Sequence, residues 1–386
     1  MGNRIGDLLS HIGGPAHSTA LIEILEILCG TEEITARTAA ASSTSKIISQ
    51  LNSSHVDQVN DYFEMFKRMS NEEAGDIFYT RVSSCFIVAE LYRALGEDLR
   101  SGLRDIYMRL VIDELPMVRR AAAQVFLSVA NEAEAEVVLD DYLQVMKSFA
   151  TDEFQTVRVI GTENLLPFLR LLKKLNTPEA VSAASELLPL VKAAGLDLSW
   201  RIRLAISKDY GDFAQMFTAD EVAYEIFPLG VHLIQDNEPD VRTNVLKGMI
   251  LFQAVVPQAL YIGDLMPIAM HLVEDPYLSA RKLLAELCID IAAKVIFCLI
   301  FFFTLLYSTL LNSSLLCPTL LHKLMVSLIL RRSQFLLPFF LFFHFYSFFS
   351  LFSSLFSSHF SCLISLLSSL IVSSIFRLAP MLSLAP

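Results

Sequence analysis

Asp236-Asn237-Glu238-Pro239-Asp240-Val241-Arg242 is the stretch that decides the fold, because its two ends recur together along the chain. An Asp followed six residues later by an Arg occurs five times, and successive Asp residues lie 39, 45, 39 and 39 positions apart. The pairs are Asp113 and Arg119, Asp152 and Arg158, Asp197 and Arg203, Asp236 and Arg242, and Asp275 and Arg281. A period of this length indicates a repeat architecture in which each repeat is one supersecondary unit.

Each unit is predicted to hold two helices joined by a short turn, because apolar residues recur at helical spacing on both sides of the motif. A Pro lies eight residues before the Asp in three successive units, at Pro189, Pro228 and Pro267. We expect it to kink or start the first helix, since it removes a backbone hydrogen bond. Pro116 and Pro239 lie where the first turn of the second helix tolerates Pro.

The recurring Asp and Arg residues are interpreted as a structural ladder. One pair of helices cannot bury its apolar face alone, so an all-α solenoid of stacked pairs is predicted. Each Arg is expected to bridge to the Asp of its own or of the adjacent turn, which contributes about 1.5–3 kcal/mol if shielded and less if exposed. Two earlier copies are weaker: Arg81 has Gly75 in the Asp position, and Arg37 has Thr31.

A two-helix unit of this length, with Pro in the first helix and Asp-x5-Arg across the turn, resembles the HEAT repeat. Three stretches are more specific: residues 76–85 (DIFYTRVSSC), 116–123 (PMVRRAAA) and 199–203 (SWRIR). They resemble turns of the scaffolding A subunit of protein phosphatase 2A. The resemblance covers residues 8–294, about seven units, so residues 1–294 are predicted to form a HEAT-repeat solenoid.

The resemblance implies a scaffold without catalytic activity. In that family the turns of the earlier repeats hold interchangeable regulatory subunits, and the last repeats hold the phosphatase catalytic subunit. Carried over by position, the regulatory-subunit ridge would contain Phe78, Tyr79, Glu114, Met117, Glu153, Phe154, Ser199, Trp200, Glu238 and Pro239. Trp200 is the only Trp of the chain. Such an aromatic can anchor an interface or pack over the neighbouring turn, and both interpretations stay open.

The sequence departs from that family where the repeats stop, near Lys294. The units that would hold the catalytic subunit do not follow. We therefore expect weak binding of regulatory subunits and no recruitment of the phosphatase by the usual route of the family.

Residues 295–386 have a different composition. They contain no Asp, Glu or Gly, only four Lys or Arg, and 16 of the 28 Phe residues. Pyrimidine-rich DNA encodes Phe, Leu, Ser and Pro, which favours a translated non-homologous tract. A membrane anchor is a second hypothesis, because the uncharged residues 295–311 approach the length of a spanning helix and Arg331 and Arg332 could lie among lipid headgroups. A low-complexity segment of another role is the third.

Composition also limits the partners of residues 1–294, which carry 41 acidic against 26 basic side chains. This balance argues against nucleic acid. Six scattered cysteines predict reduced thiols in a cytoplasmic protein, with the nucleus as a second compartment. No phosphate loop, metal motif or nucleophile motif occurs, so neither an enzyme nor a cofactor is expected. The alternative function is a HEAT-type transport or trafficking adaptor, tethered to a membrane by the tail.

Overall fold

The computed structural model describes residues 6–71 and 78–287. Every regular element in these two ranges is a helix, and no strand occurs in them, which confirms the predicted all-α fold. By its contacts the chain divides into Met1–Leu284 and Ala285–Pro386. The predicted boundary between residues 294 and 295, and the whole predicted tail, lie outside the described residues.

The first three hairpins each pair a first helix with a second helix that follows a turn. They consist of α1 (Ile22–Cys29) with α2 (Ile34–Ile48), α3 (Val56–Met69) with α4 (Phe78–Cys85) and α5 (Val88–Ala94), and α6 (Glu97–Val111) with α7 (Pro116–Glu132). Two short 3₁₀ segments, Gly6–Ser10 and Pro15–Leu21, precede α1.

The following hairpins keep this order, although two of their first helices contain a π-helical turn. The fourth pairs α8 (Ala135–Val137), the π turn Val138–Tyr142 and α9 (Leu143–Ala150) with α10 (Gln155–Leu175). The fifth pairs α11 (Pro178–Gly195) with α12 (Trp200–Lys208) and the 3₁₀ segment Tyr210–Gln215. The sixth pairs α13 (Ala219–Glu221), the π turn Val222–Ile226 and α14 (Phe227–Leu233) with α15 (Pro239–Phe252). The seventh has α16 (Gln258–His271), the 3₁₀ segment Leu272–Glu274 and helical residues 278–287.

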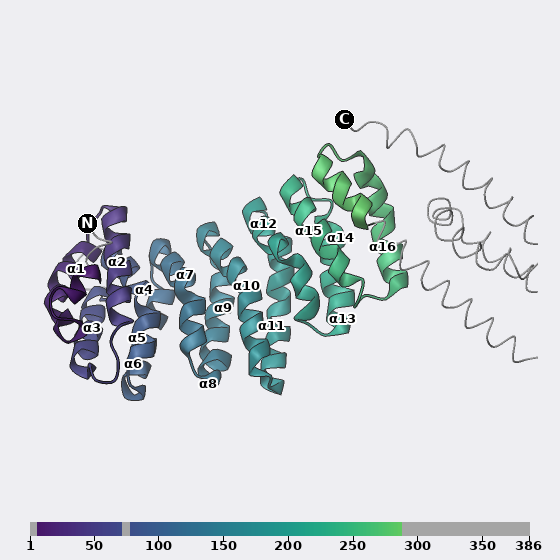
Figure 1. The fold of residues 1–386 in the computed structure, drawn as a ribbon. Helices are drawn as coiled ribbons and strands as arrows, with labels where there is room; N and C mark the ends of the chain where they lie inside the picture. The colour runs from purple at the N-terminus through teal and green to yellow at the C-terminus, as the bar shows by residue number, and fades with distance from the viewer. Residues whose placement is uncertain (1–5, 72–77, 288–386) are drawn as a thin grey trace, which may run out of the picture. The chain divides into compact units, whose positions relative to one another are not determined.

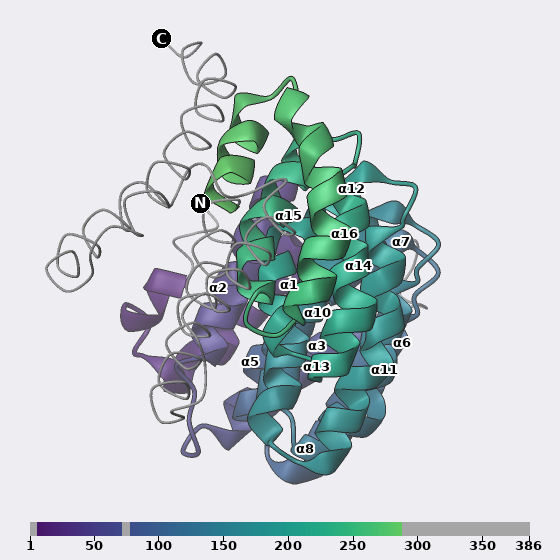
Figure 2. The ribbon, with the colours of Figure 1, turned by 90° about the vertical axis from the view of Figure 1, so that its right-hand side faces the viewer.

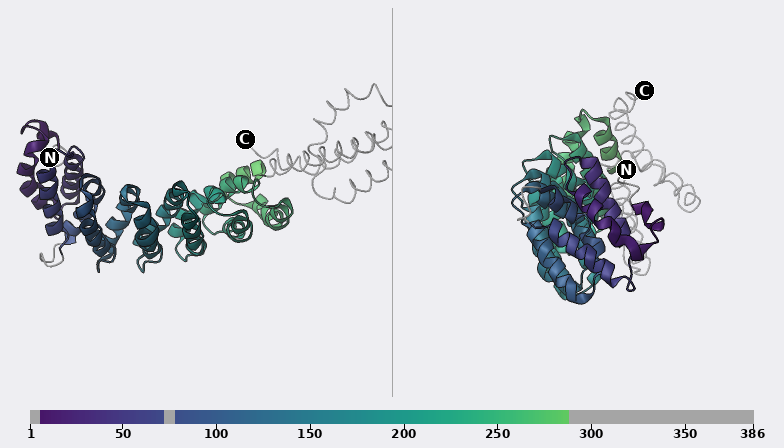
Figure 3. Two further views of the ribbon diagram at one scale, coloured as in Figure 1. Left: turned by 90° about the horizontal axis from the view of Figure 1, so that it is seen from below. Right: turned by 90° about the vertical axis from the view of Figure 1, so that its left-hand side faces the viewer.

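Successive hairpins lie side by side in chain order (Figure 1). Second helices contact second helices, as α7 does α10 and α12 does α15, and first helices contact first helices, as α11 does α14. The left panel of Figure 3 shows the same succession from below, while Figure 2 looks along the row of hairpins, which overlap in that view. The first and second helices therefore form two layers, with the apolar core between them.

Phe126 of α7 shows that neighbouring hairpins share one core. Its ring lies 5.9 Å from Tyr142, 5.8 Å from Phe149 and 5.3 Å from Phe168 between centroids, and all three belong to the next hairpin. All four rings are fully buried. Burial of an aromatic side chain stabilises by about 1.5–3 kcal/mol, so each hairpin depends on its neighbour for much of its core.

The prolines of the repeats lie either at the start of a helix or inside one. Pro116 and Pro239 lie in the first turn of α7 and α15, as predicted. Pro228 lies at the start of α14, directly after a π turn, while Pro189 and Pro267 lie inside α11 and α16.

None of the helices in the described ranges has the length and apolar run that a bilayer span needs. The predicted membrane anchor falls on residues outside those ranges.

Candidate protein-binding ridge

Each described turn with an Asp is built in the same way around that side chain. Oδ1 of the Asp accepts the backbone N–H two residues later, as Asp113 does from Leu115 at 2.9 Å and Asp236 does from Glu238 at 2.9 Å. The same bond forms at Asp152, Asp197 and Asp275, at 2.8 Å each. This short-range bond is an Asx turn, and it fixes the backbone where the second helix begins.

Four of the ladder Arg residues each bind two turns at once: Arg119, Arg158, Arg203 and Arg242. Nη1 of Arg119 donates to the carbonyl of Asp113 at 2.8 Å and to that of Glu114 at 3.1 Å, both in its own turn. Nε and Nη2 donate to the carboxylate of Asp152, in the next turn, at 2.7 and 3.1 Å. The sequence left open whether the Arg contacts its own or the adjacent turn. It contacts both, through the backbone of its own turn and the carboxylate of the next.

The contact repeats along the chain. The pairs of Arg Nε with Asp Oδ2 are Arg81–Asp113 at 2.7 Å, Arg119–Asp152 at 2.7 Å, Arg158–Asp197 at 3.2 Å, Arg203–Asp236 at 2.5 Å and Arg242–Asp275 at 2.7 Å. Arg281 donates to the carbonyl of Asp275 at 2.5 Å. The ten predicted ladder residues, together with Arg81, therefore lie along one edge of successive hairpins. We call the ten predicted residues the turn ladder.

The two weaker sequence copies also take part. Arg81 pairs with Asp113 in the next turn, although its own turn falls partly outside the described residues. Arg37 donates to the carbonyls of Thr31 at 2.7 Å and Glu32 at 3.1 Å. Because both acceptors are backbone carbonyls, this contact forms even though Thr31 stands in the position that an Asp has in the later turns.

The ladder lowers the pKa of two of its carboxylates, Asp236 and Asp275. Burial alone would raise the pKa of Asp236, but hydrogen bonds from Arg203 and from the N–H of Glu238 outweigh it and lower the pKa. The pKa of Asp275 is lowered in the same way, against burial, by Arg242 and the N–H of Tyr277. These two carboxylates therefore stay ionised and hold the guanidinium groups of Arg203 and Arg242.

The predicted ridge residues lie at or beside these turns. Glu114, Met117, Glu153, Phe154 and Trp200 are exposed, with Met117 at 62% and Trp200 at 40%. The remaining predicted residues are partly buried: Phe78, Tyr79, Ser199, Glu238 and Pro239. The surface that these side chains form is called the turn ridge below.

Some ridge aromatics also cover the ladder. The ring of Phe154 lies 5.5 Å from Cζ of Arg119, and the ring of Tyr79 lies 4.6 Å from Cζ of Arg37. A guanidinium over an aromatic face gains cation–π attraction, so these two rings help to hold the ladder. Trp200 differs, because its ring faces Arg201 of its own helix at 4.6 Å.

Sequence reasoning missed several apolar side chains on the same turns. Leu198 is 101% exposed, and Ile112, Leu196, Tyr277 and Leu278 are also exposed. All five lie within three residues of a ladder Asp, in segments that are otherwise polar and rich in helix-breaking residues. Their place in polar turns beside a ladder Asp was the signal from which their exposure could have been predicted. The turn ridge is thus apolar as well as acidic.

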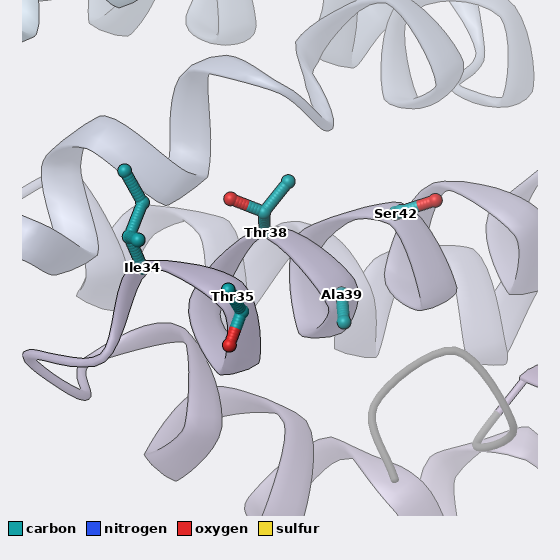
Figure 4. Close-up of a pocket in the computed structure, with 5 residues that line it drawn as sticks. All are labelled: Ile34, Thr35, Thr38, Ala39 and Ser42. Atoms are coloured by element: carbon teal, nitrogen blue, oxygen red, sulfur yellow. The ribbon is translucent and has the colours of Figure 1, made fainter.

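A shallow hollow lies elsewhere, on α2. Ile34, Thr35, Thr38, Ala39 and Ser42 line a volume of about 390 Å³ (Figure 4). None of these side chains titrates or binds metals strongly, so the hollow offers no catalytic chemistry. No group of three or more His, Cys, Asp or Glu residues could hold a metal ion in residues 6–71 and 78–287.

No model of a known protein family matches the chain. Curated relatives do. The chain is 28% identical over 181 residues to a probable serine/threonine-protein phosphatase PP2A regulatory subunit of Caenorhabditis elegans, a match that covers 47% of the chain and 30% of the relative. It is 25% identical over 229 residues to the PP2A regulatory A subunit of Saccharomyces cerevisiae, covering 57% of the chain and 35% of the relative. It is 32% identical over 143 residues to the alpha isoform of the 65 kDa regulatory A subunit of phosphatase 2A from Arabidopsis thaliana, covering 37% of the chain and 24% of the relative.

The chain is therefore distantly homologous to the regulatory A subunits of PP2A over about half of its length, and the matches span about a third or less of these relatives. Among solved structures, the karyopherin Kap121p bound to Pho4p has a TM-score of 0.56 at 12% identity, covering 76% of the chain and 31% of Kap121p. At that identity the likeness shows the fold alone, and it confirms the predicted solenoid of helical repeats.

Proposed function

We propose that this chain is a non-catalytic scaffold subunit of a 2A-type serine/threonine phosphatase, which holds regulatory subunits on its turn ridge. The observation that carries the proposal is the alignment of successive turns by the Arg–Asp ladder, with exposed apolar and acidic side chains beside it. The homology to the regulatory A subunits of PP2A supplies the partner class.

The ladder supports binding because it holds the turns in place before a partner arrives. Each turn is fixed internally by its Asx bond and externally by the Arg of the preceding hairpin. A surface ordered in advance loses less conformational entropy on association. Side chains on the ridge can therefore contribute their contacts with little ordering cost.

The side chains of the ridge suit a protein partner. Met117, Phe154, Trp200 and Leu198 expose apolar surface that contact would bury, and aromatic anchors carry a large share of interface energies. Glu114 and Glu153 lie exposed among them. Carboxylates at such positions select partners with basic groups and speed their encounter.

The proposal gives the chain no catalytic step. The relative from Saccharomyces cerevisiae is a regulatory A subunit by name, and a relative from Dictyostelium discoideum is named a phosphatase 2A scaffold subunit. Binding alone is what the ridge offers.

The test is an affinity purification with the full chain as bait, followed by titration of each purified candidate. Recovery of phosphatase regulatory subunits, with saturable binding in the titration, is the expected result. Recovery of nucleoporins or vesicle-coat proteins in their place would favour the transport adaptor and overturn the proposal.

A further inference from the structure

A groove runs between the first helices of the first two hairpins and reaches Gly30, at the end of α1, and Thr80, near the start of α4. Residues of α1 and α3 line most of it, and its volume is about 730 Å³. The two helices contact each other directly and lie side by side in Figure 1. This volume is within the range of sites that enclose a small ligand or a few side chains of a peptide.

Helix α1 brings two isoleucines to the groove, beside Glu23 and Glu26. Ile22 is half-buried there, and Ile27 is 64% exposed. The exposed side chain of Ile27 is apolar surface that a bound segment could remove from water.

Four carboxylates line the groove, and two of them have no ion pair within the described part of the chain. Glu26 is neutralised by Arg68, whose Nε and Nη2 donate to it at 3.0 and 2.7 Å. Glu64 pairs with Lys67 at 2.7 Å. Glu23 and Asp61 also line the groove, are exposed, and form no ion pair within the described part of the chain.

Ion pairs also cross equivalent helix contacts further along the chain. Lys147 of the fourth hairpin pairs with Glu186 of the fifth at 2.7 Å, and Lys192 of the fifth pairs with Glu225 of the sixth. Each of these pairs joins first helices of adjacent hairpins with one cation for one carboxylate. In the first two hairpins Glu23 and Asp61 lie beside the Arg68–Glu26 pair, which leaves net negative charge beside the isoleucines.

We propose that this groove binds a short segment of a partner protein that combines aliphatic side chains with Lys or Arg. The aliphatic groups cover Ile22 and Ile27, and the cations lie against Glu23 and Asp61. An acidic or purely polar segment would desolvate the two carboxylates without compensation, so the charges select the basic segment. The groove is a second binding surface, and it does not depend on the function proposed for the turn ridge.

The test begins with an array of short random peptides probed with the labelled full chain, followed by titration of the strongest binder by fluorescence anisotropy. Peptides that join Leu, Ile or Val with Lys or Arg should be enriched over acidic ones. Glu23→Lys with Asp61→Lys should weaken the titrated peptide about tenfold, since two exposed attractions become repulsions. The matched control is Glu136→Lys with Asp140→Lys, which reverses two exposed carboxylates of the fourth hairpin and should leave affinity within about twofold.

A second pair of variants tests the apolar part. Ile27→Ser should weaken the peptide, while Val181→Ser, at another exposed aliphatic residue of a first helix, should not. Trp200→Ala on the ridge should also leave peptide binding unchanged, which separates this surface from the proposed scaffold function. Equal losses in the control variants would show a general attraction to an acidic chain and overturn the proposal. So would the absence of binding, or equal binding of acidic peptides.

Discussion

Arg119 of the third hairpin and Asp152 of the fourth form a two-bond ion pair, with Nε–Oδ2 at 2.7 Å and Nη2–Oδ1 at 3.1 Å. The two side chains are only 11% and 7% exposed. The same guanidinium also binds the backbone of its own turn. One side chain therefore closes a turn and joins it to the next.

Replacement of Arg119 should destabilise the array strongly. Arg119→Ala leaves the Asp152 carboxylate shielded without its cation, and breaking a buried pair on one side costs about 3–5 kcal/mol. Arg158→Ala should cost less, because the Arg158–Asp197 pair is longer, at 3.2 Å, and its side chains are 24% and 18% exposed. Urea unfolding followed by circular dichroism measures both. Equal midpoints for the two variants would contradict the dependence on burial.

A conservative substitution refines this test. Arg119→Lys keeps the charge but has no planar fork, so it cannot bond two carbonyls and both carboxylate oxygens together. Its unfolding midpoint should lie between those of the wild type and Arg119→Ala. A midpoint equal to that of the wild type would mean that the positive charge alone maintains the contact with Asp152.

The ladder should make stability fall in acid. The pKa values of Asp236 and Asp275 are lower in the folded chain than their usual value, so each contributes stability at pH values above that usual value, near 3.8. This contribution is lost as the pH falls below it, through the folded pKa. Unfolding midpoints measured between pH 7 and pH 3 should therefore drop, most steeply below about pH 4.

Asp236→Asn supplies the control for the acid effect, because an amide does not titrate. The variant should be less stable than the wild type at pH 7, and the difference should shrink toward pH 3. A difference that stays constant with pH would show that the Asp236 carboxylate is not the group responsible.

Close backbone packing predicts a different defect at Gly161. A Cβ at this position of α10 would lie 2.5 Å from the carbonyl oxygen of Phe149 in α9, a distance that forces the helices apart. Gly161→Ala should destabilise by about 1–3 kcal/mol through overpacking. Gly102→Ala in α6 is the matched control, because its Cβ would meet only Phe63 at 3.8 Å; it should be neutral or stabilising by up to about 1 kcal/mol. Comparable losses of thermal stability in Gly161→Ala and Gly102→Ala would argue against the close approach of α10 to α9 at Gly161.

The sequence predicted the repeat, the helix pairs and the positions of the ladder residues because each has a periodic signal. Which turn each Arg contacts could not be predicted from the sequence. Asp113 and Asp152 both lie within reach of Arg119, and only the stacking of the helices determines which groups it binds. The sequence also provided no warning that Phe154 covers Arg119, because that contact joins residues of two hairpins. Exposed Leu198 was missed for another reason: one apolar residue in a turn has no period to detect.

Trp200 offers the sharpest test of the turn ridge. Its ring is 40% exposed, and the only ring contact that the described residues give it is with Arg201, the next residue in the chain. Trp200→Ala should therefore change the unfolding midpoint little. If the ring anchors a phosphatase regulatory subunit, its removal should weaken binding by at least about 1 kcal/mol, or roughly fivefold. Tyr224→Ala, an exposed aromatic residue on the first-helix side of the sixth hairpin, is the matched control and should bind as the wild type does. Calorimetric titration of the three proteins with one purified regulatory subunit decides the matter, and an unchanged affinity in Trp200→Ala would reject the anchor.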